Sequence, residues 1–257
     1  MNIRLPWRDR LFAAFIFFTR LPFWRIHQPR KEAYETVVEL WPLTGWLTAG
    51  CMAATLYFGS FIVPTALAAM AAIIVRILIT GALHEDGLAD FIDGFGGGGT
   101  DRRRILDIMK DSHIGTYGVV GLILYFMLLH QSLTILPPRI TALMILAADP
   151  FFKMMTAQLI QMMPYARTAK TAKGQVVYRK ISIKAGLLLL IQGTLPAIGL
   201  WYFAGLPYLC IAIPALVFYL LYLLMHRRIN GYTGDCCGAV FLLTELTFYL
   251  TYITLNS

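Results

Sequence analysis

The stretch AGLLLLIQGTLPAIGLWYFAGLPYLCIAIPALVFYLLYLLMH, residues 185–226, contains no lysine, arginine, aspartate or glutamate. A helix needs about 20 predominantly apolar residues to cross the hydrocarbon core of a bilayer. These 42 residues are therefore long enough for two crossings. Gly205, Leu206 and Pro207 near the middle predict a tight turn between them. The stretch predicts a helical hairpin that spans the membrane twice.

The composition of the whole chain supports the same environment. Of 257 residues, 58% are hydrophobic and 14% are charged. An ordinary globular domain has about 45–50% apolar and about 25% charged residues. These proportions exclude a disordered or a nucleic-acid-binding chain and indicate a protein whose solvent is a lipid bilayer.

Two further uncharged stretches lie between Glu39 and Arg76 and between Asp111 and Arg139. The apolar run at residues 11–18 is too short to cross and predicts an N-terminal interfacial helix. The predicted fold is all-α: a polytopic integral membrane helical bundle that forms one catalytic domain over residues 1–257. Its seven predicted spans are residues 42–62, 65–83, 115–136, 140–160, 185–204, 208–225 and 239–252.

Basic residues are concentrated on one side of this topology. Seven lie in residues 1–41, four in 84–114, six in 161–184 and two in 226–236, which together hold 19 of the 22 lysines and arginines. Cytoplasmic loops are enriched in these residues. The N-terminus and the long loops are therefore predicted to be cytoplasmic, and the net charge of +8 needs no polyanionic partner.

The run HEDGLADFIDG, residues 84–94, places Asp86, Asp90 and Asp93 at positions i, i+4 and i+7. On a helix these carboxylates share one face. Because like charges repel one another, the arrangement predicts a cation between them, and oxygen ligands favour Mg²⁺, Mn²⁺ or Ca²⁺. The alternative is a solvated acidic face at the end of a membrane helix.

A glycine-rich segment, FGGGGT at residues 95–100, follows the acidic run. Backbone N–H groups of such a loop, together with nearby cationic side chains, can bind phosphate. A flexible connector is an equally good interpretation of the glycines, and basic residues also mark the cytoplasmic membrane surface. The candidate phosphate-binding residues after this segment are Arg102, Arg103, Arg104, Lys110 and Asp111.

Acidic side chains that hold a metal and basic side chains that hold phosphate are suited to a diphosphate substrate. One carboxylate would take the proton of an attacking hydroxyl group, and Asp90 and Asp93 are the candidates because they lie furthest from the membrane end of the helix. Thr233 and Asp235, in a short loop flanked by glycines, either complete the substrate site or form a turn between helices. Asp149 and Lys153 are four residues apart and predict an intramembrane ion pair.

These segments resemble the cobalamin synthase family, whose members are adenosylcobinamide-GDP ribazoletransferases. The resemblance extends in order along nearly the whole chain. Two positions depart from the family pattern, since His113 stands where many members carry arginine and Leu242 where an acid is frequent. The matching motifs are residues 19–22 (TRLP), 42–45 (PLTG), 81–90 (GALHEDGLAD), 108–118 (IMKDSHIGTYG), 164–167 (PYAR) and 231–235 (GYTGD).

The resemblance implies a Mg²⁺-dependent enzyme of the cytoplasmic (inner) membrane of a prokaryote. It implies transfer of the adenosylcobinamide-phosphate moiety of adenosylcobinamide-GDP to α-ribazole or α-ribazole 5′-phosphate, with release of GMP and formation of adenosylcobalamin or its 5′-phosphate. Glu85 joins Asp86, Asp90 and Asp93 as an expected metal ligand, and Lys110 and Arg102–Arg104 are expected to hold phosphate. No nucleic acid is expected as a partner, and assembly into a homo-oligomer is left open.

Two other functions are alternatives to this one. A CDP-alcohol phosphotransferase also places carboxylates at a membrane helix end, but Asp86-Gly87-Leu88-Ala89-Asp90 departs from its motif. A cation-coupled transporter would use the acids as its ion site. Such sites lie near the bilayer midplane on interrupted helices, whereas these acids are predicted at the cytoplasmic border.

Overall fold

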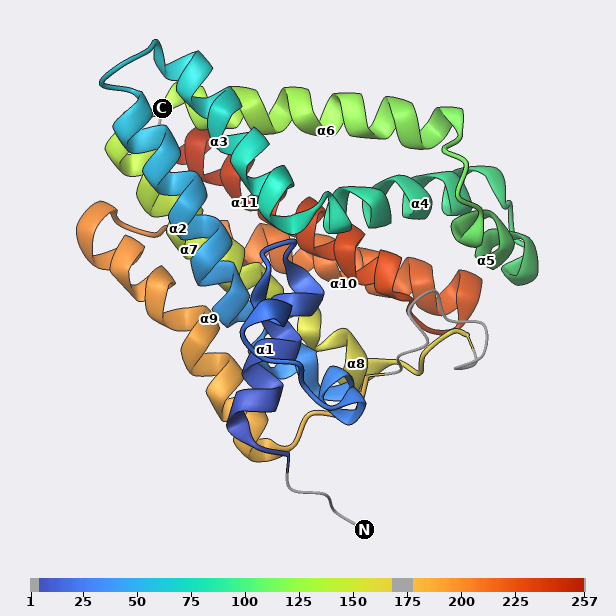
Figure 1. Cartoon of the computed structure of the whole chain (residues 1–257). Helices are drawn as coiled ribbons and strands as arrows, with labels where there is room; N and C mark the ends of the chain where they lie inside the picture. The colour runs from blue at the N-terminus through green and yellow to red at the C-terminus, as the bar shows by residue number, and fades with distance from the viewer. Residues whose placement is uncertain (1–4, 168–177, 257) are drawn as a thin grey trace.

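The computed structural model describes residues 5–167 and 178–256 and is built of helices (Figure 1). Within those two ranges the backbone forms an isolated bridge between Tyr165 and Tyr232 but no strand. Two segments are 3₁₀ helices, η1 (Phe23–Arg25) and η2 (Lys31–Leu40). The α-helices are α1 (Trp7–Phe18), α2 (Trp41–Gly59), α3 (Thr65–Thr80), α4 (Leu83–Gly97), α5 (Arg102–Lys110), α6 (Thr116–Ile135), α7 (Pro138–Ala157), α8 (Leu159–Met162), α9 (Ile183–Ala204), α10 (Leu209–Ile229) and α11 (Gly234–Asn256).

The chain is an all-α polytopic membrane protein, as predicted, but the number of spans differs. Five helices among the described residues are long and apolar enough to cross a bilayer: α6, α7 with α8, α9, α10 and α11. The bent pair α3 and α4 makes up to six. Helix α3 alone has only 16 residues. Helix α2 has 19 residues, but it contains threonines and glycines and is not apolar enough to count as a candidate membrane span.

The helices pack as two groups that share α11. Helices α2, α7 and α9 contact one another, while α4 packs against α6, α11 and α5 (Figure 1). Helix α11 also contacts α7, and 83% of its apolar window is buried, against 22–28% for α6, α9 and α10. The three outer helices therefore present most of their apolar side chains to lipid. Helix α1, predicted to be interfacial, packs on η2 and buries Ala13, Ala14 and Phe18.

A sharp bend separates α3 from the acidic helix α4. The two helices meet at 90°, whereas the sequence predicts the acidic run at the end of the span at residues 65–83 and no bend between them. Gly81 ends α3 with φ of 65°, and Ala82 follows with φ of 57°. Two successive left-handed residues cannot continue a right-handed helix, and a left-handed glycine is a common helix end. A Cβ on Gly81 would also lie 2.4 Å from Nε of Arg20.

A proline inside α9 leaves a backbone carbonyl without its partner in the helix, and a neighbouring helix supplies the missing hydrogen bond. Pro196 has no N–H, so the carbonyl of Gln192 loses its partner within the helix. Trp46 of α2 donates a hydrogen bond from Nε1 to that carbonyl at 2.8 Å. Since lipid cannot supply the missing donor, this contact both completes the backbone of α9 and joins it to α2.

Candidate functional site

Helix α4 carries all four carboxylates predicted as metal ligands, and the structure separates them. Asp86 is exposed, whereas Glu85, Asp90 and Asp93 are buried. Within residues 5–167 and 178–256 there is no group of three or more His, Cys, Asp or Glu side chains that could hold a metal ion. The predicted helix is thus confirmed, but its acids do not converge on one point.

Glu85 faces the interior of the bundle. One of its oxygens lies 3.7 Å from Nη2 of Arg76, which comes from α3 and is 2% exposed. Arg76 also donates to Glu245 of α11 at 2.7 Å and to the hydroxyl of Tyr125 of α6 at 2.5 Å. Arg76 thereby ties α3, α4, α6 and α11 together, which makes Glu85 part of a buried ion network. Glu245 was not singled out in the sequence, although it is the only charge in the last predicted span.

Asp93 bonds to backbone groups at the start of α6. Its two carboxylate oxygens accept hydrogen bonds from the backbone N–H groups of Gly115 at 2.7 Å and Gly118 at 2.9 Å. The first N–H groups of a helix have no partner within the helix, and a carboxylate there is favoured by the helix dipole. A Cβ on either glycine would lie 2.5 Å from an Asp93 oxygen. Asp93, which the sequence predicts as a catalytic and metal-binding acid, therefore positions the start of α6.

We expect Asp93→Asn to destabilise the protein without changing how it responds to Mg²⁺. The amide presents an N–H group to one of the two backbone donors, and loss of a hydrogen bond to a buried charged group costs about 1–3 kcal/mol. The melting temperature in detergent should fall by several degrees. The Mg²⁺ concentration for half-maximal activity should match that of the wild type.

Glu32→Gln, which changes an exposed acid of η2, is the control for Asp93→Asn. An unchanged melting temperature together with a raised Mg²⁺ requirement would instead return Asp93 to the metal site.

A cavity of about 330 Å³ lies beside α4 where it crosses α11. The crossing is close because two glycines face each other: a Cβ on Gly87 would lie 3.0 Å from the backbone of Asp235, and a Cβ on Gly238 would lie 3.0 Å from the carbonyl oxygen of His84. We call this space the α4–α11 cavity. Its polar lining is Asp86 and His84 of α4, Asp235 of α11, Arg167, Tyr165 and Tyr178.

Asp235 enters this cavity from the first turn of α11, which begins at Gly234 and not at the predicted Ala239. Thr233 precedes the helix, and its hydroxyl accepts a hydrogen bond from the N–H of Cys236 at 3.2 Å. This is the geometry of an N-cap residue. Thr233 is fully buried and also lies 3.4 Å from Oδ2 of Asp235. It therefore positions Asp235, which shares the cavity with Asp86.

Arg167 is a cavity residue that was not among the predicted site residues. The N–H of Ala166 donates to the carbonyl of Tyr232 at 2.8 Å, and the N–H of Tyr232 donates to that of Pro164 at 3.0 Å. This pairing holds residues 164–167 beside the start of α11. The motif PYAR was the only sequence signal for it. Burial raises the pKa of Tyr165 to about 12, so its phenol is a neutral hydrogen-bond donor at physiological pH.

The glycine-rich segment forms a helix contact, where the sequence predicted a phosphate loop or a flexible connector. Helix α4 continues to Gly97, and a Cβ on Gly94 would lie 2.4 Å from the Met109 side chain of α5. A Cβ on Gly98 would lie 2.5 Å from Ile105. These glycines let α5 pack closely on the end of α4.

Of the predicted phosphate-binding residues, Arg102 has a structural role. It donates from Nε to the carbonyl of Ile229 at 2.8 Å and from Nη2 to that of Ala166 at 3.0 Å. Both acceptors are backbone carbonyls, one of them at the end of α10. Arg102 therefore holds the segment that carries Arg167 against α5 and α10.

A second, more open space of about 570 Å³ adjoins this segment. We call it the basic groove; its lining includes Arg102, Arg103, Lys110 and Arg167. Arg167 lines both spaces, and its Nη2 donates to the carbonyl of Leu106 at 2.8 Å. Arg167 together with the cationic side chains of the basic groove could thus bind a substrate that carries more than one phosphate.

Arg104 and Asp111 line neither space. Both are exposed, and Asp111 accepts hydrogen bonds from the side chain and the backbone of His113. The side-chain hydrogen bond from His113 is the main reason why the pKa of Asp111 lies below its usual value.

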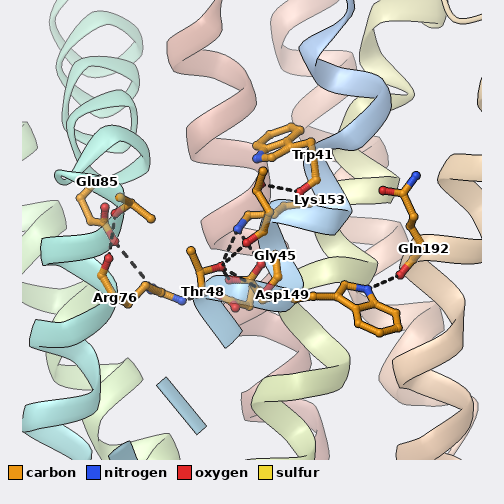
Figure 2. A network of polar contacts seen from close by, with 12 residues as sticks. Trp41, Gly45, Thr48, Arg76, Glu85, Asp149, Lys153 and Gln192 are labelled. Atoms are coloured by element: carbon orange, nitrogen blue, oxygen red, sulfur yellow. Dashed lines mark hydrogen bonds and ion pairs between the residues drawn. The ribbon is translucent and has the colours of Figure 1, made fainter. Parts of the chain in front are cut away.

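The predicted ion pair between Asp149 and Lys153 is confirmed. The two side chains are 2.6 Å apart and each is 1% exposed. The hydroxyl of Thr48 of α2 accepts from Lys153 at 3.0 Å and donates to Asp149 at 2.9 Å (Figure 2). Gly45 allows this approach, since a Cβ there would lie 2.6 Å from Asp149 Oδ1. The pair joins α2 to α7.

Comparisons with known proteins agree with one another. The profile of a family described as cobalamin-5-phosphate synthase matches residues 10–253. A protein of Leptospira interrogans is 34% identical over 94% of both chains, one of Shewanella woodyi is 35% identical over 93% of both, and one of Shewanella baltica is 30% identical over 100% of this chain and 99% of its own. All three are named adenosylcobinamide-GDP ribazoletransferase. No solved structure matches the chain.

Proposed function

The chain belongs to the cobalamin-5-phosphate synthase family, and from this premise we propose that the α4–α11 cavity is its active site. Membership makes it a transferase of cobalamin biosynthesis that catalyses the nucleotide-loop assembly step. The names of its relatives give adenosylcobinamide-GDP as the donor. The same names contain the word ribazoletransferase, and we assign α-ribazole or its 5′-phosphate as the acceptor here.

The chemistry is a displacement at phosphorus. A ribose hydroxyl oxygen of the acceptor forms a bond to the phosphorus atom attached to the corrinoid arm. The bond from that phosphorus to the bridging oxygen breaks, GMP leaves with the bridging oxygen, and the hydroxyl proton passes to a base. The phosphoanhydride already stores the driving force, so the site must position the reactants and neutralise charge.

One observation carries the assignment: two carboxylates and one guanidinium from distant parts of the sequence line one cavity. Asp86 comes from α4, Asp235 from α11, and Arg167 from the segment after α8. Arg167 has five N–H donors, and among the described residues one of them bonds to the carbonyl of Leu106. Its other donors would hold a phosphate of the donor substrate, and the neutral phenol of Tyr165 would add a further hydrogen bond.

The lining of the cavity fits Mg²⁺. This ion is usually held by one or two carboxylates together with substrate phosphates and water, not by a complete protein cage. We assign Asp86 and Asp235 as that pair, since both line the cavity and Asp86 is exposed there. Bound there, Mg²⁺ would neutralise charge on the diphosphate and on the departing GMP.

The base is assigned by excluding one of the two candidates. Asp93 is held by the N–H groups of Gly115 and Gly118 and is excluded from this role by our assignment. Asp90, buried one helical turn beyond Asp86, remains the predicted proton acceptor.

We place the protein in the inner membrane of a prokaryote, with the α4–α11 cavity open to the cytoplasm. Helix α5 and the end of α10 lie at the same end of the bundle as the start of α11 (Figure 1). Helix α5 lines the basic groove, and the last turn of α10 carries Arg227 and Arg228. This concentration of positive charge is typical of a cytoplasmic membrane face.

The test is a direct assay of the purified protein in detergent. Adenosylcobinamide-GDP, α-ribazole and Mg²⁺ are supplied together, and GMP and the joined corrinoid are measured by chromatography. We expect both products in equal amounts, and neither when Mg²⁺ is chelated. Absence of both products from folded, Mg²⁺-supplied protein would refute the assignment.

A further inference from the structure

One wall of the α4–α11 cavity is made of aromatic and apolar side chains that the chemistry described above does not use. Phe17 and Phe18 of α1, Trp41 of α2 and Tyr178 line it together with Val38 and Ile160. Phe17 and Tyr178 are half-buried and lie edge to face, with ring centres 6.1 Å apart. An aromatic wall beside a diphosphate site indicates that an aromatic part of a substrate binds there.

The indole of Trp41 can meet a ligand only at its edge. Phe18 stacks on the indole at 5.2 Å with nearly parallel rings, and His84 is also nearly parallel to it at 5.8 Å. Trp41 is 3% exposed, and its Nε1–H lies in the ring edge. Stacking thus fixes the indole on both faces, and its buried N–H has no hydrogen-bond partner among the described residues.

Two buried polar atoms in this wall have no hydrogen-bond partner among residues 5–167 and 178–256. They are Nε1 of Trp41 and Nε2 of His84. Burying such a group without a partner costs about 1–3 kcal/mol. Because both residues line the cavity, a bound ligand with a polar ring atom could satisfy them.

The volume of the cavity limits which substrate enters completely. At about 330 Å³ it lies at the lower end of the range for drug-sized ligands, about 300–1,000 Å³. A nucleoside is of this size, whereas the corrin macrocycle with its side chains and nucleotide is several times larger. The corrin must therefore stay outside, with its diphosphate arm reaching Asp86 and Arg167.

We propose that the aromatic wall binds the planar base of the acceptor nucleoside and thereby selects which base enters the product. This inference rests on the proposed function. The base packs against the exposed surfaces of Phe17 and Tyr178, and its free ring nitrogen accepts a hydrogen bond from Nε1 of Trp41. This orientation leaves the ribose toward Asp86 and Asp235, where its hydroxyl group meets the donor phosphorus.

Guanine of the donor is the competing occupant. Guanine presents three hydrogen-bonding groups on one edge. Phe17, Phe18, Val38 and Ile160 offer none to match them, which leaves Trp41 and Tyr178 as the polar residues of the wall. The base of α-ribazole is an alkylated benzimidazole, which presents a single free ring nitrogen and apolar edges. The wall, with its apolar surface and isolated N–H, matches the benzimidazole.

The first test compares Phe17→Leu with Phe15→Leu, a phenylalanine two residues earlier on α1 that does not line the cavity. We expect Phe17→Leu to raise the KM for α-ribazole about five- to tenfold and to leave the KM for adenosylcobinamide-GDP unchanged. Phe15→Leu should leave both constants unchanged. A rise in the KM for the donor with no change for α-ribazole would assign the wall to guanine and overturn the proposal.

The second test measures binding without turnover. Trp41→Phe keeps an aromatic ring but removes the N–H group, so the affinity for α-ribazole, measured by calorimetry without donor, should fall about fivefold or more. Unchanged α-ribazole affinity in both Trp41→Phe and Phe17→Leu would overturn the proposal. If the wild type transfers normally in that case, the proposed function still stands; if the wild type neither binds α-ribazole nor forms product, the proposed function itself fails.

Discussion

Asp86→Asn is expected to lower transfer by about 10²–10³-fold or more while leaving the fold intact. Asp86 is exposed in the α4–α11 cavity, so removal of its charge breaks no buried contact. In our assignment this carboxylate holds the metal that neutralises the diphosphate, and a neutral amide is a poor ligand for a hard cation. The effect should therefore appear in kcat and in the Mg²⁺ requirement.

The measurement follows GMP release over a range of Mg²⁺ concentrations, with the melting temperature recorded in parallel. Glu32→Gln, again an exposed acid converted to its amide, should match the wild type in rate of GMP release, in Mg²⁺ requirement and in melting temperature. Full activity of Asp86→Asn at the wild-type Mg²⁺ concentration would contradict the assignment of the metal site. A fall in melting temperature that accounts for the lost activity would do the same.

The helices could be predicted from the sequence because lipid imposes a simple requirement. Uncharged stretches such as residues 185–226 must form helices that satisfy their own backbone, and α9 and α10 lie where the pattern placed them. The bend at Gly81 and Ala82 could not be predicted. Alanine rarely adopts a left-handed conformation, and nothing in the local sequence marks it as doing so here.

The site was predicted in part for a related reason. Spacing along one helix showed that Asp86 and Asp93 share a face, but their roles depend on what packs there. The backbone N–H groups of Gly115 and Gly118, at the start of α6, bond to the Asp93 carboxylate, whereas Asp86 is exposed in the cavity. Arg167 and Trp41 reach the site through tertiary contacts that a single sequence does not record.

Arg76→Met is expected to have the largest effect on stability, preventing recovery of folded protein. Arg76 is the cation within 4 Å of both Glu85 and Glu245, and all three are buried. Removing one partner of a buried ion pair costs about 3–5 kcal/mol because it leaves the other charge uncompensated. Here two carboxylates lose their cation together, in a part of the bundle where α3, α4, α6 and α11 meet.

The double variant Arg76→Met, Glu245→Gln separates charge from packing. If uncompensated charge is the cause, removing the Glu245 charge should restore a measurable part of the folded yield and of the melting temperature in detergent. Arg139→Met removes an exposed arginine at the start of α7 and should behave as the wild type. A single Arg76→Met variant that melts at the wild-type temperature would contradict a stabilising role for the Arg76 charge. The position of Asp86 on α4 would then not depend on that charge.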